Sequence, residues 1–128
     1  MPFVTIYVKH GCNDKALEKS MHEITEAGEE ILENTLKRMV RVSIFETDAE
    51  RVYTAGEYEP DLAPMVVFRI GPGRSAEAKD RFMKRVSGIL QTNLGCSAEK
   101  IRGYVLDNVD GYHFCIGGKP KDFGKKVK

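Results

Sequence analysis

The sequence lacks several features that would assign a protein to a large functional class. Its 20 basic and 19 acidic residues leave a net charge of +1, so no charge excess attracts nucleic acid or an anionic membrane. No apolar run is long enough for a transmembrane helix or the core of a signal peptide. Three cysteines, an odd number without close pairs, fit a reducing cytoplasm. We therefore expect a cytoplasmic protein whose partners include neither nucleic acid nor membrane.

Motifs for metals and phosphates are also missing. The three histidines have no metal-ligand spacing with the cysteines, so we expect no metal site. The run Gly71-Pro72-Gly73 precedes a predicted helix, but no Gly-Lys-Ser/Thr follows it, and its proline removes one backbone donor. We therefore expect no phosphate-binding loop.

What the sequence does contain is an internal repeat. A segment rich in β-branched and aromatic residues begins at Pro2 and again at Pro64, and an amphipathic stretch follows each copy. The next apolar segments, 40–46 and 101–107, are closer together by a single position than the two prolines are, which places a slip in the turn between helix and strand. Each half alone would bury too little surface, so we expect one fused domain. Its parts are repeat 1 at about 2–57, a linker at about 58–63, repeat 2 at about 64–118 and a tail at 119–128.

The hydrophobic pattern predicts the order β-α-β, linker, β-α-β. Apolar residues recurring at three and four predict two helices, one capped by Asn13 and the other by Ser75. Each β-α-β crossover places its helix on one face, which gives a four-stranded sheet with both helices on one side. The other face still carries apolar residues, so we expect it to pack against sheets of other copies. The predicted strands are Phe3–Lys9, Met39–Phe45, Met65–Ile70 and Ile101–Leu106.

The second half carries a specific combination of three segments. These are Gly73-Arg74-Ser75, Ile101-Arg102 and Tyr112-His113-Phe114-Cys115-Ile116-Gly117-Gly118. Together with Pro2 and Arg41 in the first half, they give the chain a pattern that resembles the tautomerase superfamily, best known from 4-oxalocrotonate tautomerase. The resemblance covers most of the chain apart from the linker and the last residues. It implies an α+β fold of tandem β-α-β repeats, a homotrimer of fused chains and catalysis by an amino-terminal proline.

In that resemblance Pro2 is the catalytic residue. Its nitrogen is a basic secondary amine only after Met1 is removed, because within a chain it is an amide. An apolar wall and nearby arginines would both disfavour the ammonium form and lower the pKa of this amine toward about 7, which suits a general base. Taken alone, Pro2 fits better the start of a strand, where no backbone donor is needed. The motif in the second half favours the catalytic interpretation.

The resemblance also implies three substrate-binding residues. Arg74 would hold a substrate carboxylate with its planar guanidinium. Arg102 would polarise a 2-oxo group or hold a second carboxylate, in its own chain or in a neighbouring one. Phe114 would form an apolar wall that keeps the proline amine neutral. Without the resemblance, the two arginines fit surface ion pairs as well, and Phe114 fits plain core packing.

The two copies differ at complementary positions. The first copy has Pro2 but carries Cys12 where the turn arginine would be, whereas the second has Arg74 but an internal amide at Pro64. In the superfamily the arginine turn of one unit serves the proline of its partner unit. Pro2 and Arg74 therefore form a complete pair, while Pro64 and Cys12 form an inactive one. This predicts one working site per chain, and it implies that Arg41 has lost or changed its role.

The leading hypothesis for the reaction is enol–keto isomerisation without a cofactor. The substrate would be a 2-hydroxy-2,4-dienoate like 2-hydroxymuconate, of the kind formed in the degradation of aromatic compounds. The runner-up is a lyase of the same superfamily, a haloacrylate dehalogenase or a malonate semialdehyde decarboxylase, which uses a carboxylate to activate water. The positions of those acids, 115–118 and 34–43, hold no acid here, which favours the tautomerase. A third hypothesis is a non-catalytic trimeric scaffold, which a retained Met1 would favour.

Overall fold

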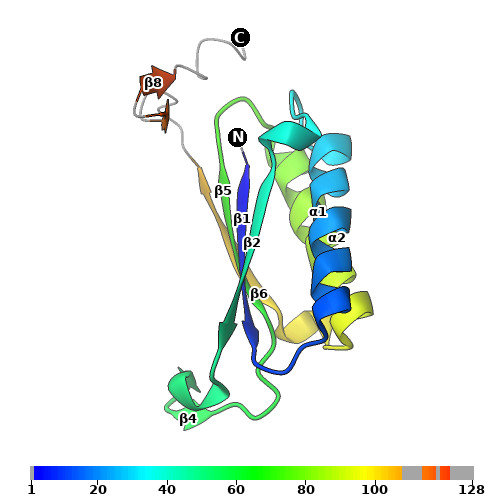
Figure 1. The fold of residues 1–128 in the computed structure, drawn as a ribbon, viewed down its shortest axis with the longest axis vertical. Helices are drawn as coiled ribbons and strands as arrows, with labels where there is room; N and C mark the ends of the chain where they lie inside the picture. Colours follow the sequence, from blue (N-terminus) through cyan, green and yellow to red (C-terminus); the bar gives the residue numbers. More distant parts are fainter. Residues whose placement is uncertain (1, 108–113, 118, 122–128) are drawn as a thin grey trace.

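The computed structural model describes residues 2–107, 114–117 and 119–121. Two helices cover one face of a four-stranded sheet whose strands lie in the order β2–β1–β5–β6 (Figure 1). The outer pairs, β1–β2 and β5–β6, are parallel, and the central pair, β1–β5, is antiparallel. The two halves therefore run in opposite directions, and their equivalent residues lie at opposite ends of the sheet. The four strands are β1 (Phe3–Lys9), β2 (Arg41–Thr47), β5 (Met65–Ile70) and β6 (Arg102–Asp107).

The helices are α1 (Asp14–Ile31) and α2 (Ala76–Leu94). Along the chain, each helix connects the two parallel strands of its half. Both begin where the sequence predicts, because the side chains of Asn13 and Ser75 accept a backbone N–H from the first turn. Helix α2 ends at Gly95, whose φ of 73° gives the left-handed conformation that glycine adopts without steric cost. Because β1 and β5 run antiparallel, the start of α2 lies at the same end of the sheet as the end of α1 (Figure 1).

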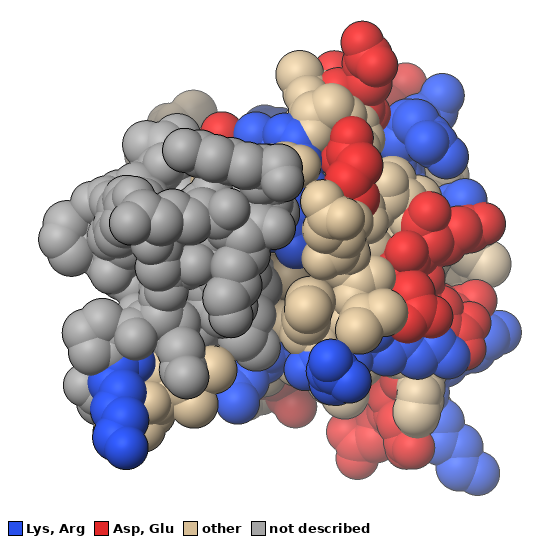
Figure 2. Space-filling model, turned by 90° about the horizontal axis from the view of Figure 1, so that it is seen from above, with Lys and Arg blue, Asp and Glu red and all other residues tan. Residues whose placement is uncertain are grey.

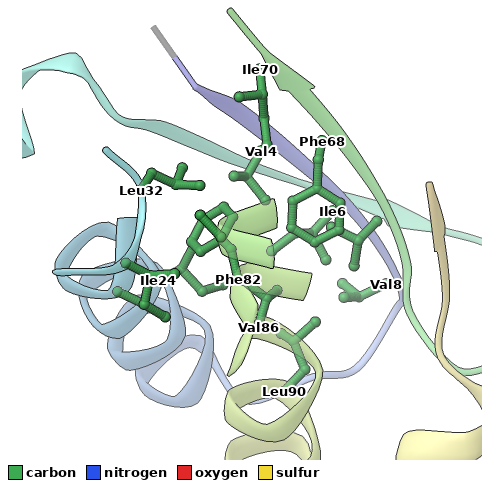
Figure 3. Close-up of a cluster of buried hydrophobic side chains, with 14 of the residues drawn as sticks. Val4, Ile6, Val8, Ile24, Leu32, Phe68, Ile70, Phe82, Val86 and Leu90 are labelled. Carbon is green, nitrogen blue, oxygen red and sulfur yellow. The ribbon is translucent and has the colours of Figure 1, made fainter. Parts of the chain in front are cut away.

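The core fills the space between the helices and one face of the sheet (Figure 3). Phe82 of α2 is 0% exposed and lies in the middle of it. Its ring meets that of Phe68 edge to face, with 5.6 Å between the centroids. Burial of these side chains is the main favourable term in folding. The labelled core residues are Val4, Ile6, Val8, Ile24, Leu32, Phe68, Ile70, Phe82, Val86 and Leu90.

Short elements occupy the connections. Residues 47–63, predicted as a polar connection, contain a two-stranded hairpin, and a second hairpin lies in the C-terminal region. The hairpins are β3 (Tyr53–Thr54) with β4 (Glu57–Tyr58), and β7 (Phe114–Ile116) with β8 (Lys119–Lys121). The 3-10 turns are η1 (Lys37–Met39), η2 (Ala49–Arg51) and η3 (Ala98–Lys100). Among the described residues, no helix has the length and hydropathy needed to cross a bilayer.

The second face of the sheet has no helix on it (Figure 1). Large side chains from all four strands are partly or largely exposed there, and the rings of Tyr7 and Phe45 stack with centroids 5.7 Å apart. We call this surface the open face. Its large exposed members are Tyr7, Phe45, Met65, Tyr104 and Leu106. A contiguous apolar surface of this kind marks a site of interaction.

Candidate active site

Pro2 lies at the end of the sheet where α1 ends and α2 begins (Figure 1). Its side chain is fully buried, with less than 2% of its surface exposed. Its carbonyl accepts the backbone N–H of Arg41 at 3.0 Å, which extends the pairing of β1 with β2 by one residue. The ring therefore has a fixed place at this end, which we call the Pro2 end.

Arg74 also lies at the Pro2 end, in the turn between β5 and α2. This follows from the antiparallel pairing of Phe3 with Arg69, which sends the end of β5 past Pro2. The structure thus brings to one end the two residues that the sequence paired, although they belong to different halves of the chain. Acidic and basic side chains are interspersed on the visible part of this end, viewed from above in Figure 2.

The guanidinium of Arg74 is bonded to the protein. Nε donates to the carbonyl of Glu33 at 3.0 Å, and Nη2 donates to the carbonyl of Asn34 at 3.3 Å and to Oγ1 of Thr35 at 2.8 Å. Nη1 donates to the carbonyl of Pro72 at 3.2 Å. The residue is 9% exposed, and burial lowers the pKa of Arg74 from its ordinary value while the Glu33 carboxylate opposes that shift. Arg74 therefore fastens the loop that follows α1 to the turn before α2.

Glu33 strengthens the same connection from the other side. Its Oε1 accepts the backbone N–H of Ser75 at 3.1 Å, at the start of α2, and its hydrogen bonding with Ser75 is the main reason that the pKa of Glu33 is lowered. A carboxylate is favourable at a helix N-terminus because the first backbone N–H groups lack intrahelical partners. The sequence indicated none of these contacts, since Glu33 and Arg74 are 41 positions apart.

Replacing Arg74 tests this structural role. We expect Arg74→Met to lower the free energy of unfolding by about 2 to 3 kcal/mol, because it removes charge-assisted hydrogen bonds to partly buried and buried acceptors. Urea unfolding at fixed protein concentration measures the change. Arg81→Met is the matched control, since Arg81 is an exposed cation of α2 and its loss should cost less than about 0.5 kcal/mol. Equal costs for the two variants would contradict the role given to Arg74.

Arg102 lies at the other end of the sheet. Its backbone N–H donates to the carbonyl of Pro64 at 3.2 Å, and it pairs with Met65 at the start of β5. Met65 and Arg69 are four positions apart on β5, which is about 13 Å at a rise of ~3.3 Å per residue. The side chain instead lines a cavity of about 320 Å³ with Tyr58, Glu59, Pro60, Asp61 and Lys100. Within one chain, the structure does not bring Arg102 to Pro2.

Phe114 begins β7, where its backbone pairs with Lys121. The side chain of Phe114 lies outside the part of the chain whose side chains the structure describes, as do residues 112, 113 and 118 of the same motif. The role of an apolar pocket wall therefore stays a prediction for this residue.

Cys12, the counterpart of Arg74 in the first half, is a partly buried free thiol. It donates to the carbonyl of Lys9 at 3.4 Å, and burial is the main cause that raises its pKa. A raised pKa lowers the thiolate fraction, which disfavours a nucleophilic role. Among the described residues, no three His, Cys, Asp or Glu side chains are placed to hold a metal ion.

A groove of about 550 Å³ lies between the two helices. Its lining is mostly charged or polar and includes Lys19, Glu23, Arg81, Lys84 and Arg85. None of the residues predicted for the active site lines it. The candidate active site is therefore located at the Pro2 end and not in this groove.

Two residues at the Pro2 end were given no role by the sequence interpretation. Arg41 holds its guanidinium carbon 5.9 Å from the ring centroid of Phe3, and Arg69 lies opposite Phe3 on the neighbouring strand. One signal in the sequence could have indicated Arg69. It is the only charged residue in the strand 65–70, and its counterpart in the first half is Tyr7.

The comparisons with known proteins rest on structure. No protein-family model and no curated protein matches the sequence. The solved structure named R7 fused 4-OT, a wild-type asymmetric trimer, superposes with a TM-score of 0.84 at 18% identity over 98% of both chains. The chain has the fold of the fused 4-OT proteins. The resemblance to the tautomerase superfamily drawn from the sequence is thereby confirmed at the level of the fold.

Other solved structures share this fold and broaden its chemistry. N1, a member of the cis-3-chloroacrylic acid dehalogenase family, superposes with a TM-score of 0.82 at 18% identity over 97% of this chain and 87% of its own. Pt0534, in a form inactivated by 2-oxo-3-pentynoate, gives 0.78 at 19% identity over 98% and 99%. The fused 4-OT fold is therefore shared by proteins named for both of the reaction types considered for this chain.

Proposed function

We propose that this protein is a tautomerase without a cofactor, which isomerises 2-hydroxy-2,4-dienoates like 2-hydroxymuconate from enol to keto form. The observation that carries the proposal is the meeting of Pro2 and Arg74 at one end of a fused 4-OT fold. After Met1 is removed, the Pro2 nitrogen is a secondary amine at the start of β1. Its apolar burial and the cation of Arg74 both favour the neutral amine over the ammonium form.

The reaction needs one group that takes a proton from oxygen and returns it to carbon. The Pro2 nitrogen accepts the proton of the 2-hydroxyl group, and the oxygen electrons form the 2-oxo group. The double bonds of the dienol shift along the chain, and a carbon at its far end takes the proton from the Pro2 ammonium. Charge and protons balance, and the amine is regenerated. A positioned base of this kind accelerates proton transfer by about 10²- to 10⁴-fold.

The assembly in this proposal is a homotrimer. The open face is apolar and R7 fused 4-OT is a trimer, so we infer that three chains pack these faces together. Arg102 would then serve the Pro2 end of a neighbouring copy, because its own lies at the opposite end of the sheet. Free Cys12 and Cys96 agree with the cytoplasmic location that we propose.

The lyase remains a second candidate because N1 has this fold at a TM-score of 0.82. Haloacrylate dehalogenation and malonate semialdehyde decarboxylation would use a cationic Pro2 instead of a neutral one. The two reactions therefore differ in the protonation state of the Pro2 amine. Assays with substrates of both classes distinguish them. Inactivity of a processed chain towards both classes of substrate would favour the scaffold hypothesis.

The experiment that tests the proposal combines an intact mass with an ultraviolet assay. The mass of the purified chain shows whether Met1 has been removed, and the assay follows the ketonisation of 2-hydroxymuconate. We expect a chain without Met1 that turns the dienol over. A processed chain without turnover, but active on 3-chloroacrylates or malonate semialdehyde, would replace the tautomerase by the lyase.

A further inference from the structure

A row of three residues crosses the sheet beside Pro2. Phe3 pairs with Arg41 of β2 on one side and with Arg69 of β5 on the other. Both arginines are exposed. Since the neighbours of Arg69 along β5, Phe68 and Ile70, are buried against the helices, the strand alternation puts Arg69 on the open face. The row therefore presents two arginines, one on each side of the residue that follows the candidate catalytic proline.

Neither arginine of this row has a carboxylate partner within the described part of the chain. Basic side chains elsewhere do pair, as Arg85 does with Glu30 at 2.7 Å and Lys79 with Asp107 at 2.9 Å. If the open face is covered by other copies, an unpaired guanidinium at its margin is costly to desolvate. An anion from solution removes that cost, and a carboxylate matches the planar guanidinium best.

The opposite end of the sheet provides an internal control. There the counterpart of Phe3 is Met65, and it is flanked by Arg102 and by Tyr7 instead of a second arginine. The end with the internal amide of Pro64 thus has one arginine beside the row. The end whose proline can become an amine has two. The additional cation thus lies at the end where the candidate catalytic amine would meet an acidic substrate.

The arginines at the Pro2 end also differ in their contacts. Arg74 uses Nε, Nη1 and Nη2 on the loop at 33–35 and on Pro72. Arg41 and Arg69 flank β1 with neighbouring strands about 4.8 Å apart, which separates their Cα atoms by roughly 10 Å. That span lets two guanidinium groups approach one substrate lying across Phe3.

We propose that Arg69 binds a carboxylate of the 2-hydroxy or 2-oxo acid that reacts at Pro2, with Arg41 flanking the same substrate. This assignment rests on the proposed function. It makes Arg69 the residue that selects acids over neutral carbonyl compounds. Arg74 keeps the wall of the site in place through the loop after α1.

Two alkylating probes separate the carboxylate from the reacting centre. 2-Oxo-3-pentynoate carries a carboxylate, and 3-pentyn-2-one is its neutral counterpart. In each, the lone pair of the Pro2 amine forms a bond to the alkyne carbon remote from the carbonyl. The displaced π electrons move to the carbon beside the carbonyl, which takes a proton as the nitrogen loses one. The adduct therefore has the summed mass of protein and probe, and no other reagent is needed.

The test compares alkylation rates of wild type, Arg69→Gln, Arg69→Lys and the control Arg85→Gln by intact mass, with the modified residue identified by peptide mapping. We expect Arg69→Gln to slow labelling by the acid about tenfold to a hundredfold and to leave labelling by the ketone unchanged. Arg69→Lys should recover part of the loss, and Arg85→Gln should match wild type. In the ketonisation assay, Arg69→Gln should raise KM more than it lowers kcat.

The outcomes separate this inference from the function on which it rests. Slowing of both probes in Arg69→Gln would mean a change in the Pro2 amine or in folding, and it would overturn the carboxylate role. Equal rates in wild type and Arg69→Gln with both probes would overturn it as well, while Pro2 stayed reactive. Failure of both probes to label Pro2 in a wild-type chain lacking Met1 would overturn the proposed function itself.

Discussion

Replacing Pro2 by alanine is expected to lower kcat for ketonisation of 2-hydroxymuconate by about 10²- to 10⁴-fold, the contribution of a positioned general base. Alanine is small enough to permit removal of Met1, so the chain still begins with an amine. It lacks the ring that fills the buried position at the start of β1. The amine is then primary, free to rotate and no longer fixed at the end of the sheet. Steady-state ultraviolet assays measure the loss.

The matched control is Pro64→Ala. The carbonyl of Pro64 accepts the backbone N–H of Arg102 just as that of Pro2 accepts the N–H of Arg41, so the two prolines have equivalent places in the fold. Because the nitrogen of Pro64 is an amide, its replacement should leave kcat within about twofold. A loss of comparable size in both variants would show that the prolines act through the fold, and the catalytic role of Pro2 would be withdrawn.

The largest expected effect on stability comes from Phe82. We expect Phe82→Ala to lower the free energy of unfolding by about 3 to 5 kcal/mol, because it removes a fully buried ring and leaves a cavity between helices and sheet. The edge-to-face contact with Phe68 disappears at the same time. Urea unfolding with an unchanged m-value measures the change. Protein concentration is kept constant, since assembly adds to apparent stability.

Leu36→Ala serves as the control for this measurement. Leu36 lies in the loop after α1 and is 45% exposed, so truncating it should cost less than about 1 kcal/mol. A cost for Phe82→Ala no greater than that of Leu36→Ala would mean that the core in Figure 3 does not carry the stability of the fold.

Local signals were sufficient for much of the fold. The predicted bounds of β1 and β5 agree with the structure, and so do the helix caps at Asn13 and Ser75, because each is encoded within a few residues. Strands β2 and β6 begin later than predicted, at Arg41 and Arg102. In both halves a 3-10 turn occupies the residues before the strand, and the register with β1 or β5, not hydrophobicity, sets where pairing starts.

The change of offset within the repeat was predicted for the turn after the helix, but it also involves the helix, because α2 has 19 residues and α1 has 18. The helices begin at Asp14 and Ala76, which keep the offset between Pro2 and Pro64. Strands β2 and β6 begin at Arg41 and Arg102, which are closer together by a single position, so the slip falls between helix start and strand start. The short β3–β4 hairpin was missed because two-residue strands leave no periodic pattern. These differences concern connections and leave the layered architecture as predicted.

The candidate site was harder to predict than the fold. Pairing of Pro2 with Arg74 followed from comparing the two copies, and the structure places both at one end. The capture of Arg74 by the loop at 33–35 depends on partners that are distant in the sequence, which no local pattern encodes. The distance of Arg102 from Pro2 depends on the antiparallel pairing of β1 with β5, a tertiary property.

The covalent connection between the halves has a consequence for how this protein can change over generations. In an assembly of identical short subunits, every substitution appears at both ends of each sheet, so a gain at one end is coupled to a loss at the other. Here each half has its own codons. Tyr7 and Arg69 could diverge independently, as could Cys12 and Arg74. One end is then free to acquire new ligands while the other retains the reaction.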